Sequence, residues 1–211
     1  MKSLDHPIFT ESIRRIREQL GVTGLDPLQQ QVLERLIHSS GDFGLTPLLR
    51  FTSEACELGL AALQAGAPIL TDTAMAAVAV KPMALRTLKS SVRSVLEWAP
   101  HEAPHGSTRT AEGLRSAWQE LAAKDADQPA PIVLIGSAPT ALEALLDLVS
   151  TGASPPSLII GMPVGFVGVS DSKWRLAVSG LAHIRLMGSR GGAGLVAATV
   201  NALLRRAWLD Q

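Results

Sequence analysis

A glycine-rich segment in the last third of the chain, residues 161–173, most restricts how this sequence can fold. It reads GMPVGFVGVSDSK and directly follows residues 157–160, an apolar stretch that is typical of a buried strand. Three glycines and one proline fall within its first eight residues, so it cannot continue the interior of a helix or strand. The pattern predicts a loop at the carboxyl end of a strand, where open α/β sheets bind ligands.

The rest of the chain alternates between short apolar stretches and helical patterns. Strands are predicted at residues 67–72, 91–98, 131–136, 157–160 and 182–187. Helices are predicted at residues 12–20, 27–40, 52–64, 108–123, 141–149 and 191–207, with Thr52 as the cap of the third. This alternation favours a single α/β domain over residues 1–211, with a mostly parallel β-sheet and helices on both faces.

Composition narrows the function classes further. Lysine plus arginine and aspartate plus glutamate both number 19, and no basic run is present, which argues against a nucleic-acid surface. Cys56 is the single cysteine, so no intramolecular disulfide can form, and we expect it to be buried on a helix. No apolar run reaches the roughly 18 residues of a membrane span, and charges near the start argue against a signal peptide. We therefore expect a cytoplasmic protein without a membrane partner.

Two glycine-containing turns have the position of anion-binding loops. GSAPT at 136–140 lies between a predicted strand and a predicted helix, so its backbone N–H groups, including that of Ser137, would suit a carboxylate or phosphate. GSRGGAG at 188–194 is placed in the same way, and Arg190 supplies charge. The alternatives are a capped helix start for the first segment and a flexible turn for the second. Neither has the spacing of a phosphate-binding P-loop or a dinucleotide fingerprint.

His38 is the histidine best placed for chemistry. It ends a predicted helix, precedes small residues, and shares a helical face with Arg35 three residues earlier. Such an imidazole can face a cavity, although a cation at a helix carboxyl end is the alternative. Arg109 begins another helix, where a cation either awaits an anionic partner or is simply solvated. No metal-ligand spacing and no G-x-S-x-G nucleophile motif is present, so we expect neither a metal nor a cofactor.

Taken together, these segments resemble the precorrin-8X methylmutase family of cobalamin biosynthesis. The matching pieces occur in family order and cover most of the chain: HPIFTESIRRIRE at the start, RLIHSSGD at 35–42, AGAPILTDTAM at 65–75, GSTRTAEGL at 106–114, IGSAPTALEALLDLV at 135–149, PPSLIIGMPVGFVGVSDSK at 155–173 and GSRGGAGLVAATVNAL at 188–203. The resemblance implies an α/β homodimer. It also implies an isomerase that moves the C-11 methyl group of precorrin-8X, or cobalt-precorrin-8, to C-12, giving hydrogenobyrinate or cobyrinate.

The resemblance also implies roles for individual residues. His38 matches the family's acid/base histidine, while Ser12, Arg35 and Arg109 match substrate contacts. To these we add residues of the predicted loops as substrate contacts, namely Ser137, Gly161, Gly165 and Arg190. A methyl shift around a conjugated ring needs no hydride carrier or nucleophile, and one imidazole with a pKa near neutrality can supply a proton.

Other readings of the sequence remain open. Residues 76–85 and 174–180 depart from the family pattern, and we expect these segments at the edge of the substrate or at the dimer partner. A tetrapyrrole-binding or carrier paralogue without turnover is the main alternative, although a carrier would need the arginines and not His38. An unrelated enzyme with an anion loop is a third reading, which the missing nucleotide-binding fingerprints disfavour.

Overall fold

Six short strands form one sheet in the computed structural model, which describes residues 5–122 and 129–211. The strand order is β1-β6-β5-β4-β2-β3, and every neighbouring pair is parallel except β1 with β6. Their bounds are β1 Leu49–Phe51, β2 Ile69–Thr71, β3 Val92–Ser94, β4 Ile132–Ile135, β5 Leu158–Gly161 and β6 His183–Leu186. The predicted mostly parallel α/β fold is therefore confirmed.

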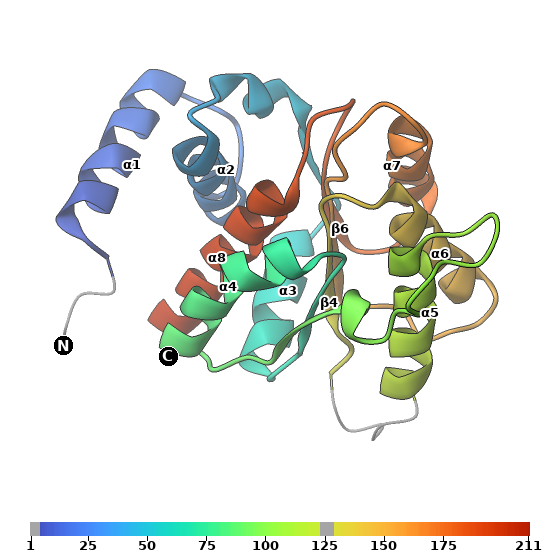
Figure 1. Cartoon of the computed structure of the whole chain (residues 1–211). Helices are drawn as coiled ribbons and strands as arrows, with labels where there is room; N and C mark the ends of the chain where they lie inside the picture. Colours follow the sequence, from blue (N-terminus) through green and yellow to red (C-terminus); the bar gives the residue numbers. More distant parts are fainter. Residues whose placement is uncertain (1–4, 123–128) are drawn as a thin grey trace.

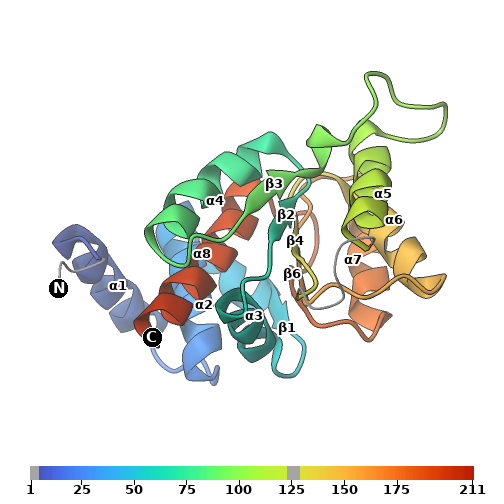
Figure 2. The same cartoon turned by 90° about the horizontal axis from the view of Figure 1, so that it is seen from below.

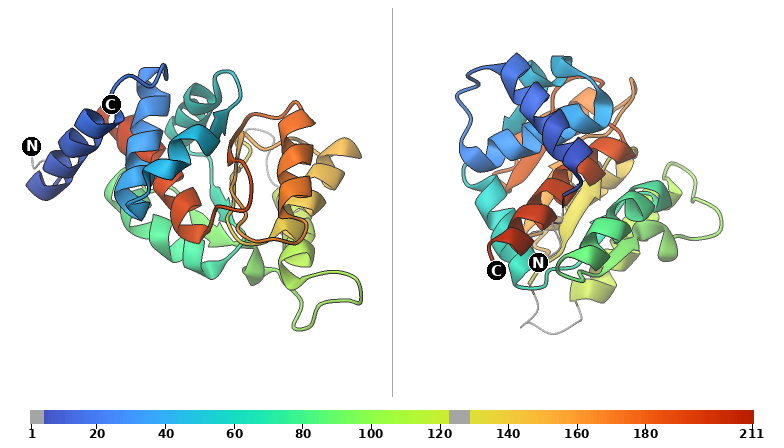
Figure 3. Two further views of the ribbon diagram at one scale, coloured as in Figure 1. Left: turned by 90° about the horizontal axis from the view of Figure 1, so that it is seen from above. Right: turned by 90° about the vertical axis from the view of Figure 1, so that its left-hand side faces the viewer.

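Helices cover both faces of this sheet (Figures 1 and 2). One face carries α2 (Pro27–Ser40), α3 (Ala55–Gln64), α4 (Ala74–Arg86) and α8 (Ala193–Leu209), with α1 (Pro7–Leu20) packed on the outer side of α2. The other face carries α5 (Arg109–Ala122), α6 (Pro139–Ser150) and α7 (Val169–Val178). Two short 3₁₀ helices, η1 (Phe43–Leu48) and η2 (Val95–Glu97), follow α2 and β3. Figure 3 shows α1 at the margin of the molecule, far from α5 to α7.

Each face has its own hydrophobic core, and β4 contributes to both. Ile132 and Leu134 pack in the core beneath α2, α3, α4 and α8, whereas Val133 and Ile135 pack beneath α5, α6 and α7. Because successive side chains of a strand point to opposite faces, a strand covered on both sides must be apolar at every position. This explains the continuous IVLI run, all of which is buried.

Several predicted boundaries are wrong for local reasons. The helix predicted at 52–64 begins at Ala55, because Thr52 instead pairs with the edge of β6: its N–H donates to the His183 carbonyl over 3.0 Å. The strand predicted at 91–98 ends at Ser94, whose side chain and Glu97 form a capping box around η2. The end of the helix predicted at 108–123 lies outside the described residues.

Besides the two 3₁₀ helices, two α-helices and one strand were not predicted. The helix α4 is rich in alanine and contains Pro82, so its sequence lacks a clear amphipathic period, yet the Thr73 side chain caps it by accepting from the Ala76 N–H over 3.3 Å. The helix α7 begins inside the predicted loop 161–173, directly after Gly168 at φ +69°. The strand β1 is only three residues long. No helix in the described ranges has the length and apolarity to span a bilayer.

Candidate active site

His38 lies in the last turn of α2, beside the first half of α1. The helix is set by Asp26, whose carboxylate accepts from the N–H groups of Leu28 and Gln29 over 2.8 and 2.9 Å, and it ends at Gly41 with φ +67°. A hydrogen bond of 2.8 Å joins His38 Nδ1 to Ser12 Oγ. The predicted substrate contact Ser12 and the predicted acid/base residue are therefore brought together from two helices.

Phe9 connects this pair to Arg35. Its ring meets the His38 ring edge to face, with 5.1 Å between the ring centroids, and the Arg35 guanidinium carbon lies 5.2 Å from the same Phe9 centroid. The structure thus places Arg35 and His38 at one aromatic ring, consistent with their predicted shared helical face, and Ser12 is joined to this group through His38.

Burial and neighbouring charge lower the pKa values of both Arg35 and His38. Burial lowers the pKa of Arg35, and the neighbouring Arg205 charge lowers it further. Arg35 Nε is buried and has no hydrogen-bond partner in the described part of the chain. Burial also lowers the pKa of His38, and the Arg35 charge adds to that effect. The site is therefore electropositive and contains one unsatisfied buried donor, which favours an anionic ligand.

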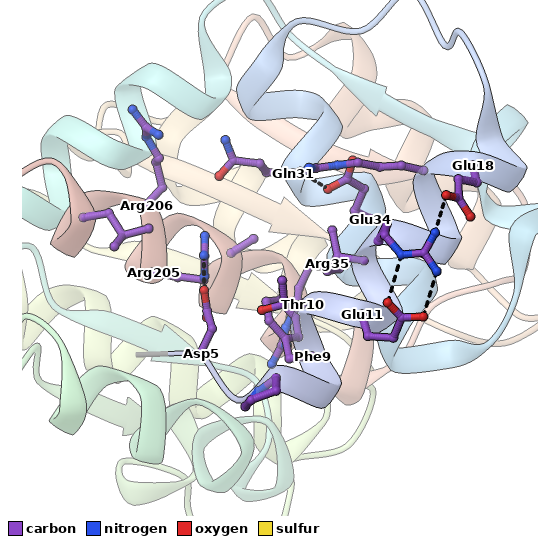
Figure 4. A pocket seen from close by; sticks show the side chains of 16 residues that line it. Asp5, Phe9, Thr10, Glu11, Glu18, Gln31, Glu34, Arg35, Arg205 and Arg206 are labelled. Carbon is purple, nitrogen blue, oxygen red and sulfur yellow. Dashed lines mark hydrogen bonds and ion pairs between the residues drawn. The ribbon is translucent and has the colours of Figure 1, made fainter. Parts of the chain in front are cut away.

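A cavity of about 1050 Å³ opens beside these residues between α1, α2 and the end of α8 (Figure 4). Phe9, Arg35 and four further arginines line the cavity. His38 is not one of the lining residues and adjoins the cavity through its ring contact with Phe9. Each of those four arginines pairs with a carboxylate, in the pairs Arg14–Glu11, Arg17–Glu34, Arg205–Asp5 and Arg206–Asp210. Within the described residues, Arg35 has no ion pair.

The predicted anion loop at 136–140 is already occupied by the protein itself. The buried Asp72 carboxylate, directly after β2, accepts from the N–H groups of Gly136, Ser137 and Ala138 over 3.0, 2.6 and 2.9 Å. Burial raises the pKa of Asp72, and these N–H groups oppose that rise. The prediction that the loop amides face a substrate is therefore wrong. A substrate contact by the Ser137 side chain stays a prediction. The sequence signal that was overlooked is an acidic residue at the end of a buried strand.

The second predicted loop is held in place by Lys173, a residue that the sequence reasoning missed. Lys173 is 2% exposed, and its Nζ donates to the carbonyls of Gly188 and Arg190, each over 2.7 Å. Arg190 in turn donates to the Asp42 carboxylate over 2.9 Å, so the loop adjoins the segment that leaves α2. The N–H of Gly165 donates to Ser189 O over 3.1 Å, which joins this loop to the one after β5.

Two other predicted contacts lie elsewhere. Gly161 is buried at the end of β5, where an added Cβ would collide with Leu176 of α7, so the structure gives this glycine a packing role. Arg109 is exposed at the start of α5, on the opposite face of the sheet from α2, and its Nε donates to Pro100 O over 2.9 Å. The structure does not bring Arg109 and His38 together within one chain.

Metal ligands do not gather anywhere in the described residues: no three His, Cys, Asp or Glu side chains are grouped to hold an ion. The chemistry that this arrangement offers is proton transfer by an imidazole, with a buried guanidinium and a large cavity beside it. Ser12 fixes one ring nitrogen of His38, and no hydrogen bond to its Nε2 is formed by the described residues.

Comparison with known proteins places this geometry in a family. A sequence model described as precorrin-8X methylmutase matches residues 7–206. Among curated relatives, the cobalt-precorrin-8 methylmutase of Synechocystis is 32% identical, with all of both chains covered. The precorrin-8X methylmutase of Pseudomonas aeruginosa is 37% identical, with 93% of each chain covered. The crystal structure of precorrin-8X methylmutase from Thermus thermophilus superposes with a TM-score of 0.84 at 36% identity, covering 96% of each chain.

The matches span nearly the whole chain, and sequence and structure agree. This chain belongs to the precorrin-8X methylmutase family, isomerases that shift a methyl group in cobalamin biosynthesis.

Proposed function

We propose that this protein moves the C-11 methyl group of precorrin-8X, or of its cobalt-containing form, to C-12, with His38 as the acid/base residue. The observation that carries the assignment is the placement of Arg35 and His38 at Phe9, with Ser12 bonded to His38, beside a cavity of about 1050 Å³. Relatives of both names, precorrin-8X and cobalt-precorrin-8 methylmutase, match the full domain.

Arg35 is the proposed anchor for the substrate. A corrinoid acid carries several carboxylates around an apolar ring, and a buried guanidinium with an unpartnered Nε is suited to bind one of them. The cavity, at about 1050 Å³, is slightly larger than the usual roughly 300–1,000 Å³ of ligand sites, which suits a large macrocycle. In this arrangement the carboxylates of the substrate occupy the cavity, and ring C of the substrate lies beside Phe9 and next to His38.

His38 is the proposed proton donor and acceptor. A Ser12 hydroxyl that donates to Nδ1 places the proton of the neutral ring on Nε2, the nitrogen left for the substrate. Protonation of the macrocycle near ring C makes methyl migration easier, and general acid help is worth roughly 10²–10⁴-fold. Because the pKa of His38 is lowered, the protonated form that donates is lost at lower pH than for a free imidazole.

A homodimer completes the proposal. Arg109 lies across the sheet from His38, so the substrate contact implied for Arg109 would have to be made to a site on a second copy. The loop after β5 supports an assembly, because Phe166 and Val167 are 95% and 88% exposed and apolar. Mixing inactive His38→Ala and Arg109→Ala proteins under subunit exchange tests this: activity should return in part if each site draws on both chains. Mixtures that stay inactive would contradict it.

The deciding experiment is single-turnover conversion of precorrin-8X, followed by absorption. His38→Ala should retain the fold and lose at least about 10²-fold in rate, while His105→Ala, in an exposed loop, should behave as the wild type. Unchanged conversion by His38→Ala would remove this residue from the mechanism. Binding of precorrin-8X by the wild type with a spectral change but no conversion would favour the carrier alternative.

A further inference from the structure

The cluster formed by Arg205, Arg35 and Asp5 at the end of the cavity holds more positive than negative charge. Both guanidinium groups lie over the Phe9 ring, with their central carbons 5.2 Å (Arg35) and 5.7 Å (Arg205) from its centroid. Arg205 makes a bidentate ion pair with Asp5, in which Nε donates to Oδ1 over 2.8 Å and a second guanidinium nitrogen donates to Oδ2. Asp5 acts on both arginines: its hydrogen bond and charge raise the pKa of Arg205, and its charge opposes part of the lowering that burial and Arg205 impose on the pKa of Arg35.

The other lining arginines already have carboxylates of their own, so this cluster is where the cavity has room for one more anion. The like charges of Arg35 and Arg205 lie at the same Phe9 ring and repel; burial is the main cause of the lowered pKa of Arg35, and the Arg205 charge lowers it further. A ligand with two or more carboxylates would relieve that repulsion by pairing with both guanidinium groups.

We propose that Arg205 binds a second carboxylate of the corrinoid substrate, next to the one on Arg35, and that Asp5 occupies Arg205 while the substrate is absent. This inference rests on the proposed function. Substrate entry then exchanges one ion pair for another. The Arg205–Asp5 pair opens, Asp5 turns to solvent, and a substrate carboxylate accepts from the same guanidinium N–H groups of Arg205. Asp5 is therefore a competitor for the site and lies just before α1 (Figure 4).

The test is equilibrium binding of cobyrinic acid, a corrinoid polycarboxylate, to the full chain by spectral titration. Asp5→Asn should bind about tenfold more tightly, because the internal competitor loses its charge, and Arg205→Gln should bind at least about tenfold more weakly. In the double variant, Asp5→Asn should bring no gain, because its effect requires Arg205. Asp147→Asn, which alters the ion pair of Asp147 with Arg175 on the opposite face of the sheet, is the matched control and should leave affinity unchanged.

The outcomes separate this inference from the proposed function. Failure of the wild type to bind cobyrinic acid would contradict the proposed function itself. If the wild type binds cobyrinic acid and Asp5→Asn binds it equally well or more weakly, the proposed exchange of ion pairs is overturned. That result is expected if the Arg205–Asp5 pair only stabilises the structure, because removing it would then not improve the affinity for the ligand. A second readout uses cobinamide, whose acid groups are amides: the Asp5→Asn gain should vanish for this ligand, and a gain of the same size would also overturn the proposal.

Discussion

Replacement of Lys173 by methionine tests how the loop after β6 is held. The ammonium group is buried, donates to two carbonyls over 2.7 Å each, and has no carboxylate partner among the described residues. Lys173→Met keeps the length and apolar stem of the side chain but leaves the Gly188 and Arg190 carbonyls without these donors. Hydrogen bonds to a charged group contribute about 1.5–3 kcal/mol each, and the cost of burying the ammonium offsets part of that sum.

The pH dependence gives this prediction its sign. Burial lowers the pKa of Lys173 from 10.5 to about 8, and the Arg185 charge adds to the effect. Between those pH values the unfolded chain binds a proton that the folded chain has released, so the free energy of unfolding rises with pH. At 1.36 kcal/mol per pH unit, the rise between the two pKa values is about 3 kcal/mol by order of magnitude.

Urea denaturation of the wild type and Lys173→Met at pH 7.5 and pH 10 measures this difference. The stability advantage of the wild type over Lys173→Met should grow between the two pH values by up to about 3 kcal/mol. Lys81→Met, which removes an exposed lysine, is the control and should show no such growth. An advantage that is constant or smaller at pH 10 would refute the view that Lys173 is a desolvated ammonium.

Three further changes test other parts of the structure. Asp72→Asn weakens three hydrogen bonds from backbone N–H groups and should destabilise the fold by about 2–4 kcal/mol, seen as a lower melting temperature; an unchanged melting temperature would contradict the buried carboxylate. Arg35→Gln removes a nearby charge and should raise the pKa of His38 in an NMR titration, whereas a constant pKa would show that the charge does not reach the ring. Gly136→Ala places a Cβ 2.8 Å from the Ala193 N atom, so it should lower stability, and wild-type stability would show that the start of α8 can yield.

Much of the fold could be predicted because local patterns suffice for it. The run IVLI, short, rich in β-branched residues and bounded by Pro131 and Gly136, is typical of a strand buried on both faces. Asp26, Pro27 and Gly41 mark both ends of α2 within the sequence. The spacing of Arg35 and His38 placed them on one helical face, and the structure confirms that both contact Phe9.

Other parts depend on partners that are distant in the sequence. Asp72 fills a loop 64 to 66 residues away. Its place after a buried strand is a local signal, but the pairing with this loop is not, so the turn at 136–140 was predicted as an anion-binding loop or a capped helix start. Lys173 is an ordinary charged residue in the sequence, and its burial follows only from how α7 packs beside the loop after β6. The helix α4 was missed because alanine-rich segments carry little amphipathic signal and a proline, here Pro82, is unusual inside a helix.

A crystal structure of the protein with hydrogenobyrinate bound would test the central claim most directly. The account predicts that Nε2 of His38 faces ring C within about 2.6–3.5 Å, while Arg35 pairs with a carboxylate of the ligand inside the cavity between α1, α2 and α8. A corrin ring bound against another face of the molecule, with His38 still joined only to Ser12, would contradict it.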